Sequence, residues 1–351
     1  MMKIRYVFLA VAACAIVSLS SCTGGTPSAD NNSNNTSATV ANSTPQVTQA
    51  SQGSHSIHHG GKKININSAI LSELDKFEGK LGVPALSNKI QANRPYAAPE
   101  ELVTKKVITQ EQFDKIKEQV TVEEVTLTGE VKDVDYMTKL GLMKGHLIVA
   151  KELLEQNKPK DAEPHIGHPV EEIYTDVEEQ LNDRKVKEFK TTLISLQDLV
   201  KANGKAEQVK TNFSNSMQAV DGAIATLPSN QRSQNSFVLQ VINGLLDSAN
   251  SEYGAAVANG KIAAAIEYQD SRGFVVYANE LYQTIASSMA RENPEAHKGI
   301  EANMAELTKV WSSVNPPTKP VKTPEEVTKL VKAIEVDSQK AIDKAATQAS
   351  S

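Results

Sequence analysis

Histidine and glutamate residues gather in one short segment of the chain. His165 and His168 lie three residues apart, and Glu171 and Glu172 follow three and four residues after His168. Two imidazoles and two carboxylates at this spacing can converge on one cation, as zinc, iron and copper sites in proteins require. The sequence therefore predicts a metal site in this segment, with Zn, Fe or Cu as its ion.

Two residues elsewhere in the chain are further candidate ligands. His146 shares its expected helix face with Met143 and Ala150, which predicts that its ring points inward. Asp270 lies in an apolar helical pattern, in phase with Gly273, so we expect a buried carboxylate. A buried carboxylate needs a partner, and a metal ion is one such partner.

A structural role is the alternative for each of these residues. His168 then caps a helix, while Glu171 and Glu172 complement the positive end of that helix. Asp270 then pairs with Arg272, or with a buried histidine, as a lock between helices. The sequence holds no nucleophile–base arrangement, phosphate-binding loop or zinc-protease helix, so no enzyme is predicted.

The segment from Glu163 to Tyr174 is expected to be a loop that enters a helix at Pro169. Proline suits the first helical position and disfavours helix at the residue before it. The His168-x-x-Glu171 pattern is loosely similar to that of imelysin-like envelope bundles, which handle iron. This resemblance implies binding or transfer of a metal or haem in the cell envelope.

The elements that must position these side chains are helices. Apolar residues recur at helical spacing over residues 137–154, 189–200, 209–227, 237–258, 262–290 and 324–346. Successive amphipathic helices bury their apolar faces by packing into an antiparallel bundle. The predicted fold class is therefore all-α, with the bundle over residues 130–350 and no evident strand.

A smaller helical module precedes the bundle, over residues 62–125. Its expected helices cover residues 68–77, 84–93, 100–102 and 109–119. Three pieces resemble the helix-hairpin-helix domain of the ComEA type, found in DNA-uptake proteins: Ile64 to Asn67 before a helix, Arg94-Pro95-Tyr96 before Glu101, and Ile116 to Val122. The resemblance implies a compact helical module and a binding role.

In the ComEA-type family, hairpin amides freed by glycine approach a DNA phosphate at a helix N-terminus. Carried over to this chain, the candidate contacts to DNA or to a partner are Gly79, Lys80, Gly82, Lys89, Lys105 and Lys106. Residues 62–125 hold ten basic and ten acidic side chains, whereas non-specific DNA affinity is built from several phosphate contacts. The charge balance favours a protein partner, with weak DNA binding as the second outcome.

The N-terminus predicts the compartment. Lys3 and Arg5 precede an apolar run that ends at Leu19 and is shorter than the ~20 residues of a membrane-spanning helix. The sequence from Leu19 to Cys22 resembles the bacterial lipobox, which implies cleavage of residues 1–21 and lipid on Cys22. Residues 22–61 are polar and are predicted to form a disordered tether. We expect a membrane-anchored envelope lipoprotein that faces the periplasm or the cell exterior.

These features together predict a tethered, non-enzymatic protein with two functional alternatives. The leading one is a binding or scaffold protein that contacts an envelope protein, or weakly DNA, through the ComEA-like module. A formal net charge of −5 argues against general attraction to polyanions, and 5% aromatic content leaves few stacking surfaces. The alternative is metal or haem handling in the envelope through the histidines and carboxylates of the bundle.

Overall fold

The computed structural model describes residues 63–69, 71–123 and 127–349. The predicted signal peptide, the tether and Cys22 lie outside the described residues. No helix among the described residues has the length and apolar content that a membrane crossing needs.

The fold class is all-α, as predicted. The apolar side chains form two separate cores, one within residues 64–122 and one within residues 136–341. The long helices that the apolar periodicity predicts are present in the predicted order. The helix over Pro294–Thr308 and two short pairs of strands were not predicted. Each of these strands has two residues, which is too short to produce a detectable alternation of apolar and polar side chains.

The first core belongs to a module of short helices. Ile66, Leu74, Phe77, Leu86 and Ile90 are fully buried in it. The strands β1 and β2 are parallel, with Ile64 opposite Val120, and they join the two ends of the module. Its elements are β1 (Ile64–Asn65), α1 (Leu71–Leu81), α2 (Leu86–Ala92), α3 (Glu101–Thr104), α4 (Gln110–Ile116), the 3₁₀ turn η1 (Lys117–Gln119) and β2 (Val120–Thr121).

The second core belongs to the helical bundle. Its first half contains α5 (Gly129–Glu155), α6 (Pro159–Ala162), α7 (Pro164–His168), the π-helix η2 (Pro169–Ile173), α8 (Tyr174–Asp183), α9 (Lys190–Lys201) and α10 (Ala206–Ile224). Its second half contains α11 (Ser229–Arg232), α12 (Asn235–Ala256), β3 (Val257–Ala258), β4 (Lys261–Ile262), α13 (Ala265–Glu292), α14 (Pro294–Thr308) and α15 (Pro324–Ala349).

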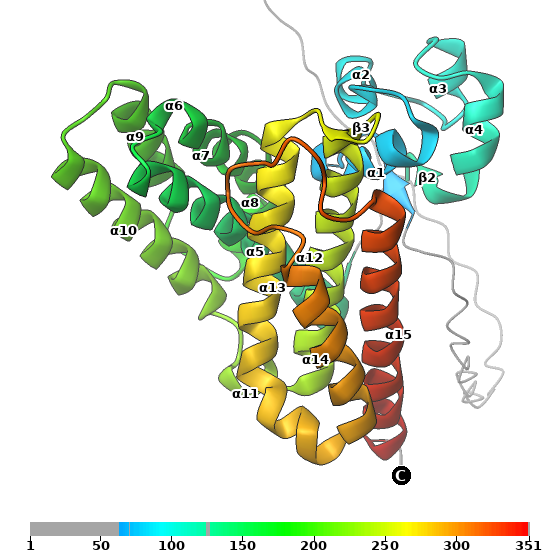
Figure 1. Ribbon diagram of the computed structural model, residues 1–351, viewed down its shortest axis with the longest axis vertical. Coiled ribbons are helices and arrows are strands. Elements are labelled where there is room, and N and C mark those ends of the chain that lie inside the picture. The colour runs from blue at the N-terminus through cyan, green and yellow to red at the C-terminus, as the bar shows by residue number, and fades with distance from the viewer. Residues whose placement is uncertain (1–62, 70, 124–126, 350–351) are drawn as a thin grey trace, which may run out of the picture. The chain divides into compact units, whose positions relative to one another are not determined.

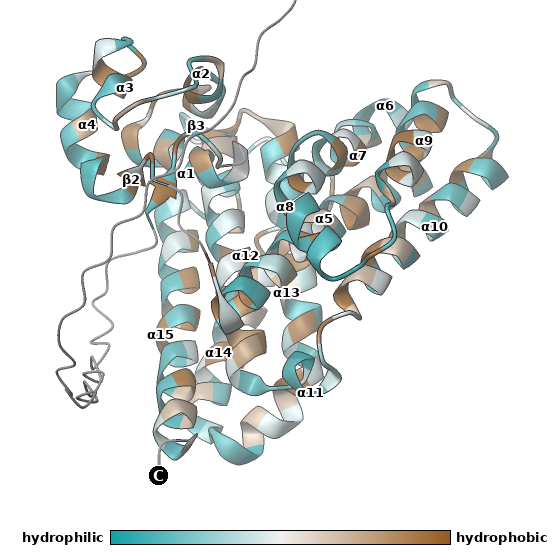
Figure 2. Ribbon diagram, turned by 180° about the vertical axis from the view of Figure 1, so that it is seen from behind, coloured by the Kyte–Doolittle hydropathy of each residue, from teal (hydrophilic) through white to brown (hydrophobic). Residues whose placement is uncertain are grey.

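The helices α12, α13, α14 and α15 form a closed set in which each helix packs against two of the others (Figure 1). On α15, the buried residues Val327, Val331, Ile334, Ser338 and Ala341 recur every three or four positions. This spacing places them on one face, and Figure 2 shows α15 with both hydrophobic and hydrophilic stretches. The helix α5 packs against α12 and α13 and thereby joins the first half of the bundle to this set.

A hairpin of strands, rather than a simple turn, connects α12 to α13. The strands β3 and β4 are antiparallel, and Asn259 and Gly260 between them both have positive φ, at 54° and 69°. Two positive φ values are typical of a type I′ turn, for which Asn-Gly is the favoured sequence. The hairpin ends α12 at Ala256 and delays the start of α13 to Ala265, so the predicted boundaries at 258 and 262 were wrong.

Two glycines allow α5 and α13 to approach closely. A Cβ atom added to Gly273 would lie 2.2 Å from the carbonyl oxygen of Gly145, and one added to Gly145 would lie 2.6 Å from Phe274. Neither position can hold a larger residue unless the helices separate. Because His146 follows Gly145 and Asp270 lies one turn before Gly273, this crossing brings the two polar side chains together.

The segment from Glu163 to Tyr174 is helical, and the prediction of a loop that enters a helix at Pro169 was wrong. His168 and Pro169 both have right-handed helical backbone angles. The chain passes through proline by switching from α7 to the π-helix η2, in which the hydrogen-bond spacing is longer. Single π-turns inside α-helices are frequent at functional sites.

Candidate metal centre

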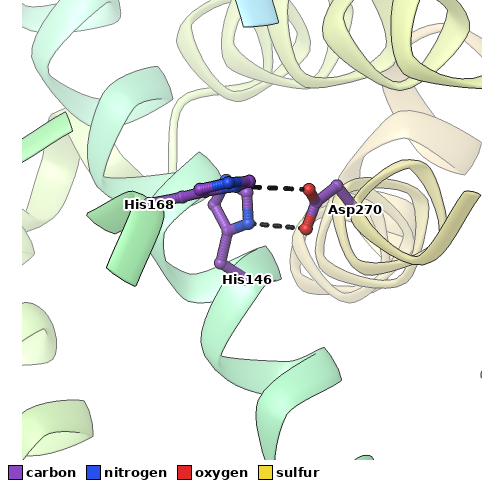
Figure 3. A group of neighbouring side chains, drawn as sticks. All are labelled: His146, His168 and Asp270. Atoms are coloured by element: carbon purple, nitrogen blue, oxygen red, sulfur yellow. Dashed lines mark hydrogen bonds and ion pairs between the residues drawn. The ribbon is translucent and has the colours of Figure 1, made fainter. Parts of the chain in front are cut away.

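The carboxylate of Asp270 on α13 lies at the centre of a cluster of three imidazoles. Nδ1 of His146 on α5 and Nδ1 of His165 on α7 each lie 2.7 Å from Oδ1 of Asp270. Nδ1 of His168, also on α7, lies 3.5 Å from Oδ2. Figure 3 shows the rings of His146 and His168 turned toward the two carboxylate oxygens.

The Asp270 side chain is ionised in this environment. It is only 2% exposed, and burial by itself would raise its pKa. The charges and hydrogen bonds of His146 and His165 outweigh burial, so the pKa of Asp270 lies well below its ordinary value. An ionised Asp270 can only accept hydrogen bonds, so the imidazole Nδ1 atoms that face it are donors.

His165 was predicted as a metal ligand, but both of its ring nitrogens are engaged. Its Nδ1 donates to Asp270, and its Nε2 lies 2.9 Å from Oε1 of Gln269. The amide nitrogen of Gln269 donates to the carbonyl oxygen of Val314, so Oε1 is the acceptor and His165 Nε2 is the donor. Both ring nitrogens of His165 therefore already have hydrogen-bond partners, and His165 is not in the group whose ligand atoms converge.

His146, His168 and Asp270 form the group with metal-ligand geometry. Each offers one ligand atom, and these atoms all lie within 4.8 Å of one another. Ligand atoms at ~2.0–2.2 Å from one ion lie roughly 3–3.5 Å apart, so small adjustments suffice for these three to share an ion. His146 is almost completely buried, and it packs edge-on against Phe274, which confirms the prediction that its ring points inward.

His168 is the member of the group with access to solvent, because 37% of its side chain is exposed. Burial by itself would lower its pKa, but the hydrogen bond and charge of Asp270, with Glu172 and Glu171, raise the pKa to about 9. Glu171 is exposed and Glu172 is partly exposed on η2. The two glutamates therefore act on His168 through their charge, and they are not in the group whose ligand atoms converge.

The structural alternative described Asp270 paired with Arg272 or with a buried His146. The pairing with Arg272 does not occur, whereas the pairing with His146 does, at 2.7 Å. Arg272 instead makes a bidentate ion pair with Glu152 on α5, at 2.9 Å, and donates to the carbonyl oxygen of Trp311. Sequence reasoning did not identify Gln269, which holds His165 in place. The only available signal was a polar side chain beside Asp270 in an apolar helix.

The residues proposed to contact DNA do not form an open phosphate site. The carboxylate of Glu78 accepts hydrogen bonds from the backbone N–H of Ala85, at 3.0 Å, and of Ser87, at 2.9 Å. These amides lie at the start of α2, where an anion would bind. Gly79 faces Gly254 of α12 rather than a free surface, and Gly82 has the positive φ of a turn.

The four lysines of the same set differ in their contacts. Lys105 donates to the carbonyl oxygens of Asn93 and Pro95, and its ammonium group lies 4.6 Å from the centre of the Tyr96 ring. Lys80, Lys89 and Lys106 are exposed. Lys105 is exposed as well, but its ammonium group is engaged by these carbonyl oxygens and by the carboxylate of Glu101, 3.1 Å away.

Comparison with protein families finds a match in the second half of the bundle. Residues 228–345, about a third of the chain, match the family model of an iron permease-associated 4-helix bundle domain. This span contains α11 to α14 and the part of α15 up to residue 345. It includes Asp270, whereas His146, His165 and His168 precede it. Comparison with curated proteins and with solved structures finds no match.

The match corrects two predictions. The ComEA-type resemblance of residues 62–125 was wrong, because the family comparison finds the iron permease-associated domain and no helix-hairpin-helix domain. The scaffold or DNA-binding function that depended on it was therefore also wrong, and Glu78 and Lys105 give the physical reason. The match agrees better with the alternative, in which the bundle handles a metal. The candidate centre is the cluster of His146, His168 and Asp270, and Asp270 lies on α13 within the matched span.

Proposed function

We propose that this protein binds iron as cargo between α5, α7 and α13, through His146, His168 and Asp270. The observation that carries the proposal is the convergence of two imidazoles and one buried carboxylate. Two histidines and one carboxylate with open positions are the donor set of non-haem Fe(II) sites. The iron permease-associated family of the neighbouring helices supports the choice of iron.

The packing around Asp270 suits a bare ion rather than haem. The rings of His146 and His168 lie 5.4 Å apart in an edge-to-face arrangement, and Phe274 lies 5.0 Å from His146 on another side. Side chains this close leave the ligand atoms pointing at one position between them. The exposed part of His168 provides the approach from solvent.

We place this activity at the cell envelope, without catalysis, on a lipid anchor at Cys22. The support for the compartment is the lipobox-like sequence that ends at Cys22 and the polar tether after it. A lipid-anchored protein that holds iron would keep the ion close to a membrane. Tethering requires no interaction between the bundle and the lipid itself.

Metal titration of the chain without residues 1–22 tests the proposal. Fe(II) under anaerobic conditions, Zn(II) and Cu(II) are each added to metal-free protein, and bound metal is counted by elemental analysis. We expect one ion per chain. Loss of a hydrogen-bond partner of a metal ligand lowers metal affinity ~10–100-fold, and Asp270→Asn and His168→Ala change a ligand itself, so each should lower the affinity at least as much.

The matched control is His297→Gln. His297 is an imidazole of the same bundle, but it hydrogen-bonds to the hydroxyl of Tyr282 on α13 and lies outside the converging group. This variant should bind iron like the wild type. Metal-free wild-type protein, with a melting temperature that none of the three ions changes, would rule the proposal out.

A further inference from the structure

We propose that His165 is a positioning residue that holds Asp270 in its ligating orientation, and that it does so most strongly when a metal ion is bound. This inference rests on the proposed function, because it concerns the same centre. His165 is completely buried, and its Nδ1 lies 2.7 Å from Oδ1 of Asp270.

The contacts between Asp270 and the three imidazoles divide into two kinds. Those from His146 and His168 use the Nδ1 atoms that face the carboxylate, and a metal ion bound by these atoms replaces their protons. The hydrogen bond from His165 is not affected, because His165 is not one of the converging ligands. When the ion binds, the carboxylate therefore loses two imidazole donors and keeps the third.

His165 is itself held by a chain of hydrogen bonds that leads away from the centre. Its Nε2 donates to Oε1 of Gln269, whose amide nitrogen donates to the carbonyl oxygen of Val314 at 3.1 Å. Val314 belongs to the segment after α14, which Tyr268 and Arg272 also bind through the carbonyl oxygens of Ser313 and Trp311. His165, which donates to Asp270, is thus held through both of its ring nitrogens.

Close packing beside α7 keeps His165 from turning away. A Cβ atom added to Gly167 would lie 2.7 Å from the side-chain nitrogen of Gln197 on α9. The same nitrogen donates a hydrogen bond to the carboxylate of Glu163, which directly precedes α7. The helix α7 is therefore seated against α9. A ligand whose orientation is fixed before the ion arrives loses less conformational freedom on binding.

The test uses the full chain with Co(II) as the probe, since its visible absorption reports the ligands around the ion. The variant His165→Leu removes the donor, whereas His165→Asn retains an N–H in place of Nδ1. We expect a ~10–100-fold loss of Co(II) affinity and altered absorption bands for His165→Leu, and recovery of most of both by His165→Asn.

The melting temperatures of the same proteins separate positioning from general stability. In metal-free His165→Leu, two imidazoles still donate to Asp270, so the melting temperature should fall less than it does in the Co(II)-bound protein. Gln269→Leu provides a second route, since it frees His165 without removing it, and should give a smaller loss of affinity.

Four outcomes decide the inference. Graded losses in the order His165→Leu, Gln269→Leu, His165→Asn would support it. Equal Co(II) affinity and unchanged absorption in all three variants would overturn it and leave iron binding intact, as would equal losses in His165→Leu and His165→Asn. Wild-type protein that binds neither Co(II) nor Fe(II) would overturn both the inference and the proposed function.

Discussion

At the scale of single residues, the chain carries buried acidic groups apart from the candidate centre. Asp75 on α1 is 9% exposed, and Glu252 on α12 is 4% exposed. Burial, with the charges of Glu78, Glu267 and Glu172, raises the pKa of Asp75 to about 7, against the opposing hydrogen bond from Ser87. Burial and the charge of Asp75 also raise the pKa of Glu252 well above its ordinary value. The charge of Asp75 therefore makes Glu252 harder to ionise.

The raised pKa of Asp75 predicts a pH-dependent stability. Between its ordinary value of 3.8 and about 7, the folded protein keeps a proton that the unfolded chain releases, so stability falls as the pH rises through this window. Asp75→Asn removes this loss. At pH about 8 we expect the variant to be more stable than wild type by on the order of 1–4 kcal/mol, and near pH 4 to be equal.

Thermal unfolding at both pH values measures the effect. Asp114→Asn is the control, because Asp114 lies about half exposed on α4 and pairs only with neighbouring side chains of the same segment. A stabilisation of Asp75→Asn that is the same at both pH values would mean that ionisation of Asp75 is not its cause.

At the scale of elements, the crossing of α5 and α13 determines whether the centre exists. Gly145 and Gly273 let the two backbones approach. The ion pair between Arg272, which directly precedes Gly273, and Glu152, about two turns after Gly145, also ties the two helices together. Close approach is needed because an imidazole and a carboxylate must meet across the interface. The glycines at the crossing therefore make possible the contact between the polar side chains of His146 and Asp270 beside it.

Gly273→Ala tests this dependence. The new Cβ would overlap the carbonyl oxygen of Gly145, so the helices must separate, at a cost of about 1–3 kcal/mol. Separation moves Asp270 away from His146, and Fe(II) affinity should fall as well. Gly222→Ala is the control, since nothing lies within 4 Å of that position on α10, and it should stabilise by roughly 0.5–1 kcal/mol. The measurements are chemical denaturation and metal titration, and equal effects of the two changes would contradict the explanation.

At the scale of the whole molecule, the candidate ligands come from helices far apart in the sequence. Between His146 and Asp270 lie more than a hundred residues, and α6 to α12 are folded between them. An ion held by α5, α7 and α13 therefore links the two halves of the bundle. Ligand binding to the folded state alone stabilises it by RT ln(1 + [L]/Kd), which is ~2.7 kcal/mol at a ligand concentration of 100 Kd.

Hydrogen exchange should show where that stabilisation acts. We expect added Fe(II) to slow amide exchange in α5, α7, η2 and α13, because opening of these helices then requires release of the ion. Residues 64–122 have a separate core and should exchange at an unchanged rate. Amide exchange is measured by mass spectrometry in the wild type and in Asp270→Asn, each with and without Fe(II). If Fe(II) slows exchange in the variant as well, the ion binds elsewhere.

The sequence predicts the helices well because each buries one apolar face, which leaves a regular pattern. For the same reason it predicts the burial of His146 and Asp270, which share those faces. The role of His165 was not predictable, since it depends on Gln269 and on the carbonyl oxygen of Val314, which is distant in the sequence. The hydrogen bonds from Ala85 and Ser87 to Glu78 likewise form only once α2 has turned back on α1.

The division of the candidate ligands between two parts of the chain has an evolutionary consequence. The span that matches the iron permease-associated family contributes Asp270 alone, and the imidazoles come from the helices before it. A four-helix unit inherited without α5 and α7 would keep a buried carboxylate with no partner, at a cost of several kcal/mol. Chains of that kind should therefore carry an apolar residue where Asp270 stands, so that the histidines and the aspartate are gained or lost together.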